Sequence, residues 1–446
     1  MRRVFVGFSG VAASAGLLLF SGSVPIAAQT PATPAAFTHS EPTALLASRL
    51  VLDLGATDYR LRSAADEQLS KLGAAARPEL EQALHNENPE VRLRAKELLK
   101  RIRIGALWDA GTFTYAEKGK PASKAIESLV EQTGNHVLLG DQYGNFEDKA
   151  LDLALTDAPF WPTLDDICRR TSNKLRPHYD TREPGLVLTA GDPGRYPVAY
   201  SGPIRAQITS ARRAFSEEID YETVRSDKSH TFQINLQMMW EDRFRLTAYR
   251  SQPELVLART DSGTEIASTQ PQSSGWNVAG GGTRQLTMNL RLHPPTTTAR
   301  KLETLTIKWG LIAVGDMAEM RVEDLTGRNP LYQDDVELRV ENVEQGPGQR
   351  CELTLGIVRD LVLTDPQEAF FQECDADLID QHGVPYRKQG QTNSHDDDCA
   401  RMKLTFVGES ADSQPKAVVF RYPRIRDQRD VVITFRDVPL PNGRPE

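Results

Sequence analysis

A stripe of residues near the N-terminal end of the chain returns thirty positions later, and this internal repeat limits the fold more than any other feature. The positions of the first copy and then of the second are Leu61, Arg62, Ala65, Leu69 and Leu72, followed by Val91, Arg92, Ala95, Leu99 and Ile102. A constant offset across apolar positions at helical spacing is typical of stacked helical repeats rather than of one amphipathic helix. Such repeats usually present a surface to a partner and carry no chemistry of their own.

Helix start and stop signals divide residues 43–107 into two helix hairpins. The spacing predicts helices over residues 43–54, 58–72, 75–85 and 89–104. Thr57 and Asn88 stand at N-cap positions, and Gly73 stands at a C-terminal stop. Two hairpins are fewer than stacked repeats generally need to bury a continuous core, so we expect this part to lean on a neighbouring domain or on a partner.

The repeated residues resemble those of HEAT repeats. The matching positions are Arg62, Ala65, Leu69, Leu72 and Gly73 in one copy, and Pro89, Glu90, Val91, Arg92, Ala95 and Leu99 in the other. More narrowly, the segment is similar to the short HEAT-like module at the start of many uncharacterised exported bacterial proteins. The resemblance implies a pair of helix hairpins that docks a partner, and it implies no particular activity.

Residues 1–28 have the features of a secretory signal peptide and are set aside from the fold. Arg2 and Arg3 form a short basic start, an apolar stretch follows, and Ala27 and Ala28 offer a small-residue cleavage site. We therefore expect export and a periplasmic or extracellular location after cleavage. The alternatives are that the apolar stretch stays as a membrane anchor, and that the paired arginines mark twin-arginine export.

The composition and charge of residues 29–446 bear on disorder, nucleic-acid binding and membrane insertion. Residues 29–42 are rich in Pro, Thr and Ala and are expected to form a disordered tether. The formal charge of −8, which becomes −10 without residues 1–28, gives no electrostatic reason to bind nucleic acid. No other run is long and apolar enough to cross a bilayer, so we expect no stable transmembrane segment once the signal peptide is removed.

A second internal echo, offset by 38 residues, lies within residues 108–194. In each copy an amphipathic helix follows a proline, ends at Thr-Gly-Asn or Thr-Ser-Asn, and leads into a strand. The predicted order is strand-helix-strand-strand-helix-strand-strand, a small α/β domain with strands over residues 113–116, 136–139, 151–155, 175–179 and 186–189. Residues 151–159 resemble part of the short N-terminal domain of secretins and of some TonB-dependent receptors. That resemblance implies a module that makes protein contacts and is not an enzyme.

From residue 195 onward, apolar and polar residues alternate in short segments that are separated by Gly, Asn, Asp and Pro. This pattern predicts strands joined by turns. We predict two immunoglobulin-like β-sandwiches, over residues 195–328 and 329–446. The whole chain is therefore expected to combine α, α/β and all-β domains. The β-rich region is similar to the C-terminal part of the same exported proteins, with matches at Leu236, Trp240, Glu241, Asp261, Gly263 and Val438 to Pro441.

Two details of the β-rich region are specific enough to check. The clearest alternation predicts strands over residues 232–238 and 286–292. Residues 255–263 and 376–383 look like one hairpin used twice, because each strand leads into a turn that ends in glycine.

Four cysteines are present, and none forms a Cys-x-x-Cys pair, so metal ribbons and thioredoxin-type chemistry are unsupported. Cys168 falls in an apolar helix stripe and is expected to be a buried thiol. Cys374 and Cys399 flank a polar insertion, and an oxidising compartment would allow them to form a disulfide. Cys351 is the rival partner, and unrelated thiols are the other interpretation.

Two glycine- or tryptophan-containing turns offer candidate binding chemistry. Trp240 and Glu241 could form a ligand-binding shelf, but we favour a core tryptophan followed by a polar turn. Residues 280–283 read Gly-Gly-Gly-Thr, yet no lysine follows and the next predicted element is a strand, so we favour a hairpin loop over a phosphate loop.

Two acidic clusters offer carboxylates for cation binding or for glycoside hydrolysis. Residues 395–398 read His-Asp-Asp-Asp and could hold a cation, but they lack the alternating ligands and glycine of a calcium loop, so we favour a solvated loop. Glu217, Glu218 and Asp220 could supply a glycosidase carboxylate only if a second group lay about 5–9 Å away across a cleft. We predict no catalytic, cofactor-binding or metal-binding residues.

These patterns favour a non-enzymatic exported scaffold or protein-interaction protein of the bacterial cell envelope, whose partner is another envelope protein. One alternative is carbohydrate or cell-wall binding by a face of the β-sandwiches, for which Trp276 beside the glycine-rich loop is the motive. A second alternative is an unrecognised hydrolase, although the chain has neither an H-E-x-x-H nor a G-x-S-x-G motif.

Overall fold

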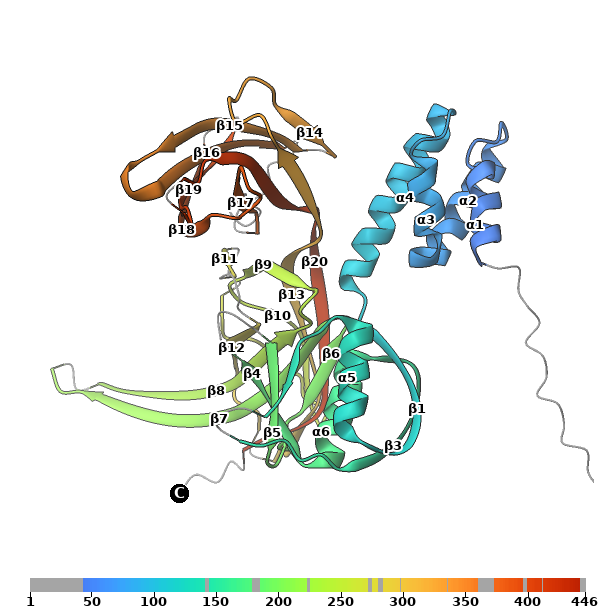
Figure 1. Cartoon of the computed structure of the whole chain (residues 1–446). Coiled ribbons are helices and arrows are strands. Elements are labelled where there is room, and N and C mark those ends of the chain that lie inside the picture. The colour runs from blue at the N-terminus through green and yellow to red at the C-terminus, as the bar shows by residue number, and fades with distance from the viewer. Residues whose placement is uncertain are drawn as a thin grey trace, which may run out of the picture.

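The chain forms a helical part, a small α/β part and a large antiparallel β part, in that order (Figure 1). This mixed architecture is the one that the sequence predicts at the coarse level. The computed structural model describes residues 43–140, 144–178, 185–222, 225–271, 275–279, 284–296, 298–334, 336–359, 373–395, 399–410 and 412–441.

The helical unit, residues 43–108, closes around an apolar core of its own. Its elements are α1 (Thr43–Asp53), α2 (Tyr59–Leu72), the 3-10 turn η1 (Gly73–Ala76), α3 (Arg77–Ala83) and α4 (Pro89–Trp108). Ala65, Leu69, Ala95 and Leu99 are all buried, so these repeated positions form the face that each helix turns to this core. The repeat fails at its first position, because Leu61 is 52 % exposed whereas its counterpart Val91 is buried.

The helix ends differ from the predicted ones in three places. Asp58, one residue after the expected cap, accepts a hydrogen bond from the backbone N–H of Arg60 at 2.8 Å and caps α2. The helix expected over residues 75–85 is shorter, because η1 occupies its start. Helix α4 continues to Trp108, since its last residues are buried in the β part.

The repeated arginines hold the loops that precede α2 and α4. Arg62 Nη1 donates to two backbone carbonyl oxygens of the first loop, at 2.8 and 2.9 Å. Arg92 Nη1 donates to two carbonyl oxygens of the second loop at the same distances. The acceptors are Ala56, Thr57, Asn86 and Glu87. Each arginine therefore satisfies backbone groups that a helix hairpin would otherwise leave to water.

Replacing Arg62 or Arg92 with alanine is expected to lower the free energy of unfolding of the helical unit by about 1–3 kcal/mol, because two charge-assisted hydrogen bonds are lost. Urea unfolding followed by the helical circular dichroism signal measures this loss. Arg60→Ala is the matched control, since that exposed arginine lies on the same helix and its side chain has no described bond. An equal loss for Arg60→Ala and Arg62→Ala would contradict the role given to Arg62.

The α/β unit, residues 112–190, has the predicted order of strands and helices. Its elements are β1 (Thr112–Pro121), α5 (Ala122–Thr133), β2 (Val137–Leu139), β3 (Ala150–Pro159), α6 (Phe160–Thr171), β4 (Asn173–His178) and β5 (Gly185–Ala190). Strands β1 and β3 pair antiparallel, while β5 lies between β2 and β4. The echo also holds at the atomic level: Asn135 Nδ2 donates to Thr133 Oγ1 at 3.0 Å, and Asn173 Nδ2 donates to Thr171 Oγ1 at 2.7 Å.

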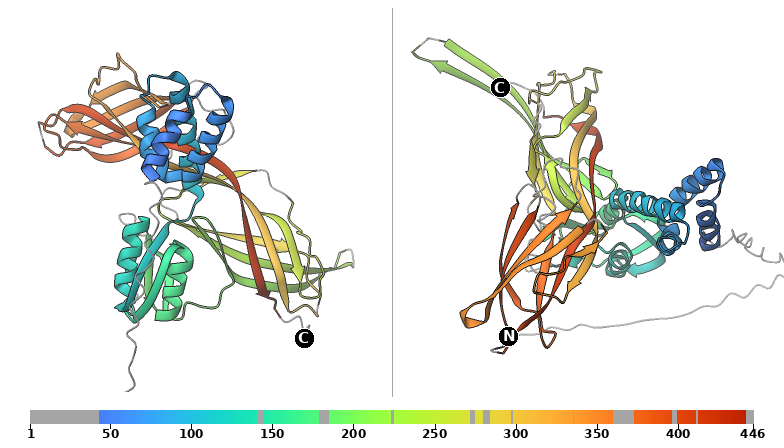
Figure 2. Two further views of the ribbon diagram at one scale, coloured as in Figure 1. Left: turned by 90° about the vertical axis from the view of Figure 1, so that its right-hand side faces the viewer. Right: turned by 90° about the horizontal axis from the view of Figure 1, so that it is seen from above.

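Two long strands run through the whole β part and pair along their length (Figure 2). They are β13 (Lys301–Val322) and β20 (Pro415–Pro439). The first sandwich adds β6 (Val198–Ser201), β7 (Ile204–Asp220), β8 (Arg225–Trp240), β9 (Arg245–Arg250), β10 (Glu254–Thr260), β11 (Trp276–Val278) and β12 (Gln285–Leu292). The second adds β14 (Leu331–Gln333), β15 (Val336–Gln345), η2 (Pro347–Gln349), β16 (Arg350–Arg359), β17 (Asp375–Asp380), β18 (Arg387–His395) and β19 (Ala400–Val407).

The predicted boundary between the two sandwiches near residue 328 is wrong, because β13 and β20 each belong to both sandwiches. Residues 425–440, assigned from the sequence to the second sandwich, supply Val431 and Phe435 to the first core. Residues 318–322, assigned to the first sandwich, supply Met320 to the second core. A local pattern of alternation cannot show that one strand serves two cores, because the alternation continues unchanged from one core to the next.

The hairpin that looked repeated in the sequence is repeated in the structure. Each copy has a glycine with positive φ, Gly263 at 81° and Gly383 at 84°, where only glycine is unstrained. The matching backbone bonds are Gly263 N to Thr260 O (2.9 Å), Gly383 N to Asp380 O (3.1 Å), Ile266 N to Ala258 O (2.8 Å) and Tyr386 N to Leu378 O (2.8 Å). The two sandwiches therefore share a local building element.

The structure has no disulfide among the four cysteines, so the pair of Cys374 and Cys399 that the sequence allows is not formed here. Cys374 lies directly before β17, in the sheet built on β20, whereas Cys399 lies directly before β19, in the sheet that packs opposite. Burial raises the pKa of Cys168 to about 12 and that of Cys351 to about 11. Neither of these two is a thiolate nucleophile at neutral pH.

Candidate functional site

The turn after β8, considered from the sequence as a ligand shelf, is a junction between domains. Trp240 is buried in the first sandwich core, and Glu241 is fully buried beside it. Both carboxylate oxygens of Glu241 accept a hydrogen bond from the Gly111 N–H at 3.0 Å. Arg243 Nε lies 3.0 Å from Glu241 Oε2, and Asn135 Nδ2 lies 3.4 Å from it. One carboxylate thus joins the sandwich to the start of the α/β unit.

The same turn reaches the helical unit and a second part of the α/β unit. Arg243 donates to the carbonyl oxygens of Ala106, at 2.8 Å, and of Asp109, both at the end of α4. Asp242 accepts from the His136 N–H at 2.5 Å and pairs with Arg284 at 3.1 Å. Since these partners belong to three parts of the chain, residues 241–243 fix how those parts meet.

Asp242 gives this junction a pH dependence. Burial raises the pKa of Asp242, although the His136 N–H and the Arg284 guanidinium act in the opposite direction. A carboxyl whose pKa is higher in the folded chain stabilises the fold when protonated. That contribution is fully present below the unfolded pKa of about 3.9 and is lost as the pH rises through the folded value.

We therefore expect Asp242→Asn, which keeps an acceptor for the His136 N–H, to lose less stability than the parent chain between about pH 4 and pH 7. Urea unfolding at both pH values gives the two free energies for each protein. The same pH dependence in both proteins would contradict the raised pKa.

The end of α4 is the second junction. Trp108 Nε1 donates to Asp427 Oδ2 at 2.8 Å, and the Trp108 ring meets Phe244 edge to face at 5.0 Å between centroids. The guanidinium of Arg429 lies 4.9 Å from the centroid of the same indole. Trp108 and Leu107 belong to the first sandwich core. The helical unit therefore packs against the first sandwich through the end of α4.

A cluster of charges completes the attachment of the helical unit. Asp316, which has a positive φ of 51°, lies where β13 passes from one sandwich to the other. Its carboxylate pairs with Arg103 at 3.1 Å and with Arg77 at 3.5 Å. Arg103 also pairs with Glu81 at 3.1 Å. Helices α3 and α4 are therefore tied to the long strand as well as to each other.

The outer side of the helical unit carries a groove between α1 and α3. Its volume is about 450 Å³, and it is lined by Ser48, Val51, Leu52, Glu79, Gln82, Ala83, His85 and Asn86. Leu52 is 71 % exposed on the rim of the groove, although Leu50, two residues earlier in α1, is buried in the core. Glu79 Oε2 is buried in the described structure without a hydrogen-bond partner. Helix α1, which forms one wall of the groove, lies on the side of the helical unit away from the sandwiches (Figure 1).

The second exposed surface is a projecting hairpin that the sequence did not predict. The arm, residues 212–222 and 225–231, is the outer half of β7 and β8, and it extends beyond the rest of the first sandwich in both views (Figures 1 and 2). Strand β12 pairs with β8 only from residue 232 onward, and β6 pairs with β7 only up to residue 207. The two strands of the arm have only each other as strand partners among the described residues.

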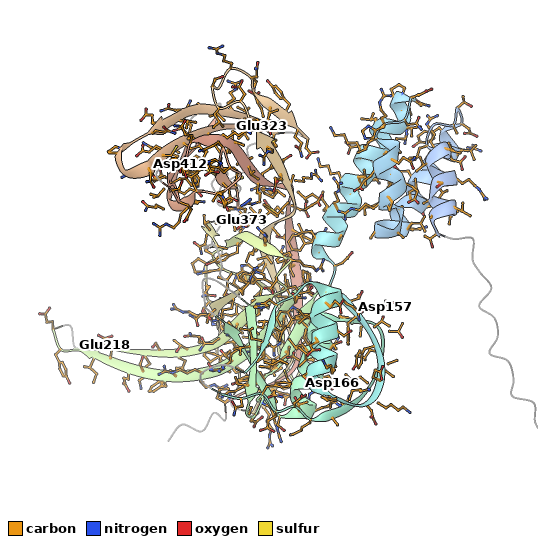
Figure 3. All side chains as sticks on the ribbon, in the orientation of Figure 1. Asp157, Asp166, Glu218, Glu323, Glu373 and Asp412 are labelled. Atoms are coloured by element: carbon orange, nitrogen blue, oxygen red, sulfur yellow. The ribbon has the colours of Figure 1, made fainter. Side chains whose placement is uncertain are left out.

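The acidic residues considered as a glycosidase pair lie on this arm. Glu217 is paired with Lys228 at 3.4 Å, and Glu218, labelled in Figure 3, is its neighbour on the same strand. Adjacent residues of a strand point to opposite faces, so these two carboxylates cannot face each other across a cleft. The backbone of Asp220 lies at the end of the same strand.

A cavity with a volume of about 830 Å³ lies beside β10. Lys308 in its wall pairs with Glu254 at 2.8 Å. Arg250, also in the wall, lies 4.7 Å from the centroid of the Trp276 ring. The guanidinium covers this face of the tryptophan that motivated carbohydrate binding. The glycine-rich run 280–283 lies outside the described residues, as do three of the four residues of the cluster at 395–398.

Within the described ranges, no group of three or more His, Cys, Asp or Glu side chains gathers as a metal site would require. In the same part of the chain, no helix combines the length and the apolar character needed to span a bilayer. No protein-family model matches the chain, and no curated protein or solved structure is significantly similar to it. We therefore infer function from the surfaces themselves.

Proposed function

We propose that this chain is a non-enzymatic scaffold of the bacterial cell envelope that docks another envelope protein through the groove between α1 and α3. The observation that carries the proposal is the position of that groove. It lies between α1 and α3 of a helical unit that Trp108 and the pairs of Asp316 with Arg77 and Arg103 fix to the β part. The groove combines an apolar strip of Val51, Leu52 and Ala83 with polar side chains such as Gln82 and Asn86, a mixture that suits a protein partner.

The proposed location rests on the sequence of residues 1–28, with its basic start, apolar stretch and small-residue cleavage site. The finer fold assignments belong to the same proposal. The helical unit would be HEAT-like, the α/β unit would be similar to the short N-terminal domain of secretins, and the sandwiches would be immunoglobulin-like. All three classes commonly serve in protein contacts, and none supplies a reaction.

The groove also argues against a hydrolase. It gathers Ser48, His85 and Glu79, the residue types of a nucleophile, a base and an orienting acid. However, the Ser48 hydroxyl donates to the Ala44 carbonyl oxygen at 2.9 Å, and within the described helical unit no hydrogen bond joins these three side chains. A serine nucleophile needs its base within hydrogen-bond reach, so docking accounts for the groove better than catalysis does.

The test compares two exposed leucines of the same unit. Leu52→Glu places a charge on the rim of the groove, whereas Leu93→Glu places one on α4, among residues that do not line it. We expect quantitative pull-down from envelope extract to lose one protein by tenfold or more with Leu52→Glu and to keep it with Leu93→Glu. Equal recovery with both variants would remove the groove as the docking site.

A second candidate function, glycan binding, is favoured by the outer face of the first sandwich. Side-chain amides from β7, β8 and β12 form a hydrogen-bonded row there, in which Gln207 donates to Gln237 and Gln237 donates to Gln285 at 2.7 Å. Each amide has more donors and acceptors than these bonds use, and hydroxyl-rich ligands can engage the remainder. Binding on a glycan array that disappears with Gln237→Leu would support this candidate, and an empty array would end it.

A further inference from the structure

One face of the arm carries large apolar side chains, interspersed with charged ones, that nothing else in the described chain covers. Phe215, Ile219 and Tyr221 are 56 %, 50 % and 86 % exposed. They occupy alternate positions of the strand and its turn, so they share one face, to which the cross-strand neighbour His230 adds its ring at 4.8 Å from that of Phe215.

This face continues the inner face of the first sandwich. Arg213 is the cross-strand neighbour of Phe232, which is buried in the first core, and Phe215 and Glu217 follow at alternate positions. The opposite face carries small polar groups, such as Ser216 and Ser229, whose hydroxyls are 2.7 Å apart. The arm is therefore an amphipathic two-stranded sheet whose inner face extends past the sheet that covers it elsewhere.

An isolated two-stranded hairpin is only marginally stable in water, and three or more strands or a packed face are usually needed. An apolar face on such a hairpin marks a contact surface. Inside the sandwich the same face is covered by a second sheet with its own apolar face, so the occupant that fits the arm is another sheet of the same kind.

The distribution of charge along this face indicates that the partner sheet is the arm of a second copy of the chain. The base carries Arg213, whose Nε is buried and has no hydrogen-bond partner in the described structure. The centre carries the opposed pair of Glu217 and Lys228, and the tip carries Tyr221 and the exposed Glu222. A second arm laid antiparallel on the first would place an acidic, aromatic tip over each basic base.

We propose that the arms of two copies of this chain pack face to face and antiparallel, with Phe215 and Ile219 of both copies between them. The antiparallel direction places the two sandwiches at opposite ends of the paired arms. A parallel arrangement would drive the second sandwich into the sheet that already covers the inner face of the first. The proposal is independent of the groove on the helical unit.

The size of the contact sets the expected affinity. Each large aromatic side chain can bury about 150–250 Å², so a contact built on Phe215, Ile219 and Tyr221 falls at or below the lower end of the about 1,200–2,000 Å² of stable interfaces. We therefore expect a reversible dimer with a Kd on the order of micromolar.

Sedimentation equilibrium of the whole protein over about 1–100 μM tests this expectation. The parent chain should associate to a dimer, and Phe215→Ser with Ile219→Ser should weaken that association at least tenfold. Val432→Ser, at an exposed apolar position of β20, is the matched control and should leave it unchanged. A monomer throughout, or a dimer insensitive to the double variant, would overturn the proposal.

A charge-exchange experiment distinguishes the proposed antiparallel arrangement from non-specific hydrophobic association. Arg213→Glu and Glu222→Arg should each weaken the dimer, and the two together should restore it, because the exchanged charges meet between copies. Restoration is needed as evidence, since Arg213 also donates to the Pro295 carbonyl oxygen at 2.8 Å within its own chain. Failure of the pair to restore association would overturn the antiparallel arrangement.

Two further measurements test whether the arm binds a membrane instead, and whether dimerisation is independent of the groove on the helical unit. Binding of the monomer to vesicles of phosphatidylethanolamine and phosphatidylglycerol, lost with Phe215→Ser and Ile219→Ser, would assign the arm to a membrane surface and overturn the dimer. Leu52→Glu should leave dimerisation intact, so a loss of docking at the groove and a loss of arm pairing remain separate results.

Discussion

Replacing Glu241 with alanine is expected to lower the free energy of unfolding by about 2–4 kcal/mol and to loosen the α/β unit from the first sandwich. The Glu241 carboxylate is fully buried, and the Gly111 N–H donates to both of its oxygens. Its removal leaves a buried donor without an acceptor and Arg243 without its ion-pair partner. Because the Arg243 side chain is 32 % exposed and can turn toward water, we place the effect below that of a fully buried pair.

The conservative variant Glu241→Gln separates the two contributions. It keeps an oxygen acceptor for the Gly111 N–H and removes the charge that Arg243 faces, so its effect should be smaller than that of alanine. Urea unfolding measures both losses, and limited proteolysis near residue 110 reports whether the α/β unit has loosened. An unchanged free energy of unfolding and an unchanged cleavage rate for Glu241→Ala would contradict the junction.

Trp108→Ala should have the other large effect, a loss of about 3–5 kcal/mol, because a large aromatic side chain leaves a cavity in the first sandwich core. The variant also loses the contacts of the ring with Phe244 and Arg429 and the hydrogen bond to Asp427. Since α4 is the end of the helical unit that packs into the sandwich, we expect the unit to become mobile relative to it.

Trp108→Phe is the control for the hydrogen bond. It keeps an aromatic ring against Phe244 while removing the donor to Asp427 and part of the ring volume, so we expect a loss clearly smaller than that of Trp108→Ala. Thermal unfolding gives the stability of each variant, and small-angle scattering gives the mobility of the helical unit as an increase in maximum dimension for Trp108→Ala. If the alanine variant kept both the stability and the dimension of the parent, α4 would not be the anchor.

The elements with the strongest local patterns were predictable. The thirty-residue repeat foretold the buried faces of α2 and α4, and the two Thr-x-Asn sequences foretold equivalent helix ends, because in each case the residues that interact are near one another in sequence. The alternating strands at 232–238 and 286–292 are also neighbours in the sheet, with Leu286 opposite Met238.

The long-range features were not predictable in the same way. Asp316, a turn-forming residue type with positive φ, interrupts the alternation within β13, yet the strand continues past it and stays paired with β20. Strand β7 was missed since a bulge between Ile208 and Ser210 shifts its alternation and the acidic Glu217 and Glu218 follow.

The functional surfaces show the same limit. Glu241 was visible as part of a polar turn, but its partner Gly111 lies 130 positions away and carries no signal of the contact. Leu50 and Leu52 are identical in type and two residues apart, yet one is in the core and the other is on the rim of the groove. Only the packing of α1 against α3 decides which leucine is left exposed on the rim of the groove.

Photo-crosslinking in intact cells tests the docking groove most directly. A photoreactive residue at position 52 should give one dominant crosslinked species with a second envelope protein, and the same residue at position 93 should not give that species. Crosslinks at position 52 that are absent, or that match those at position 93, would contradict a docking role for the helical unit.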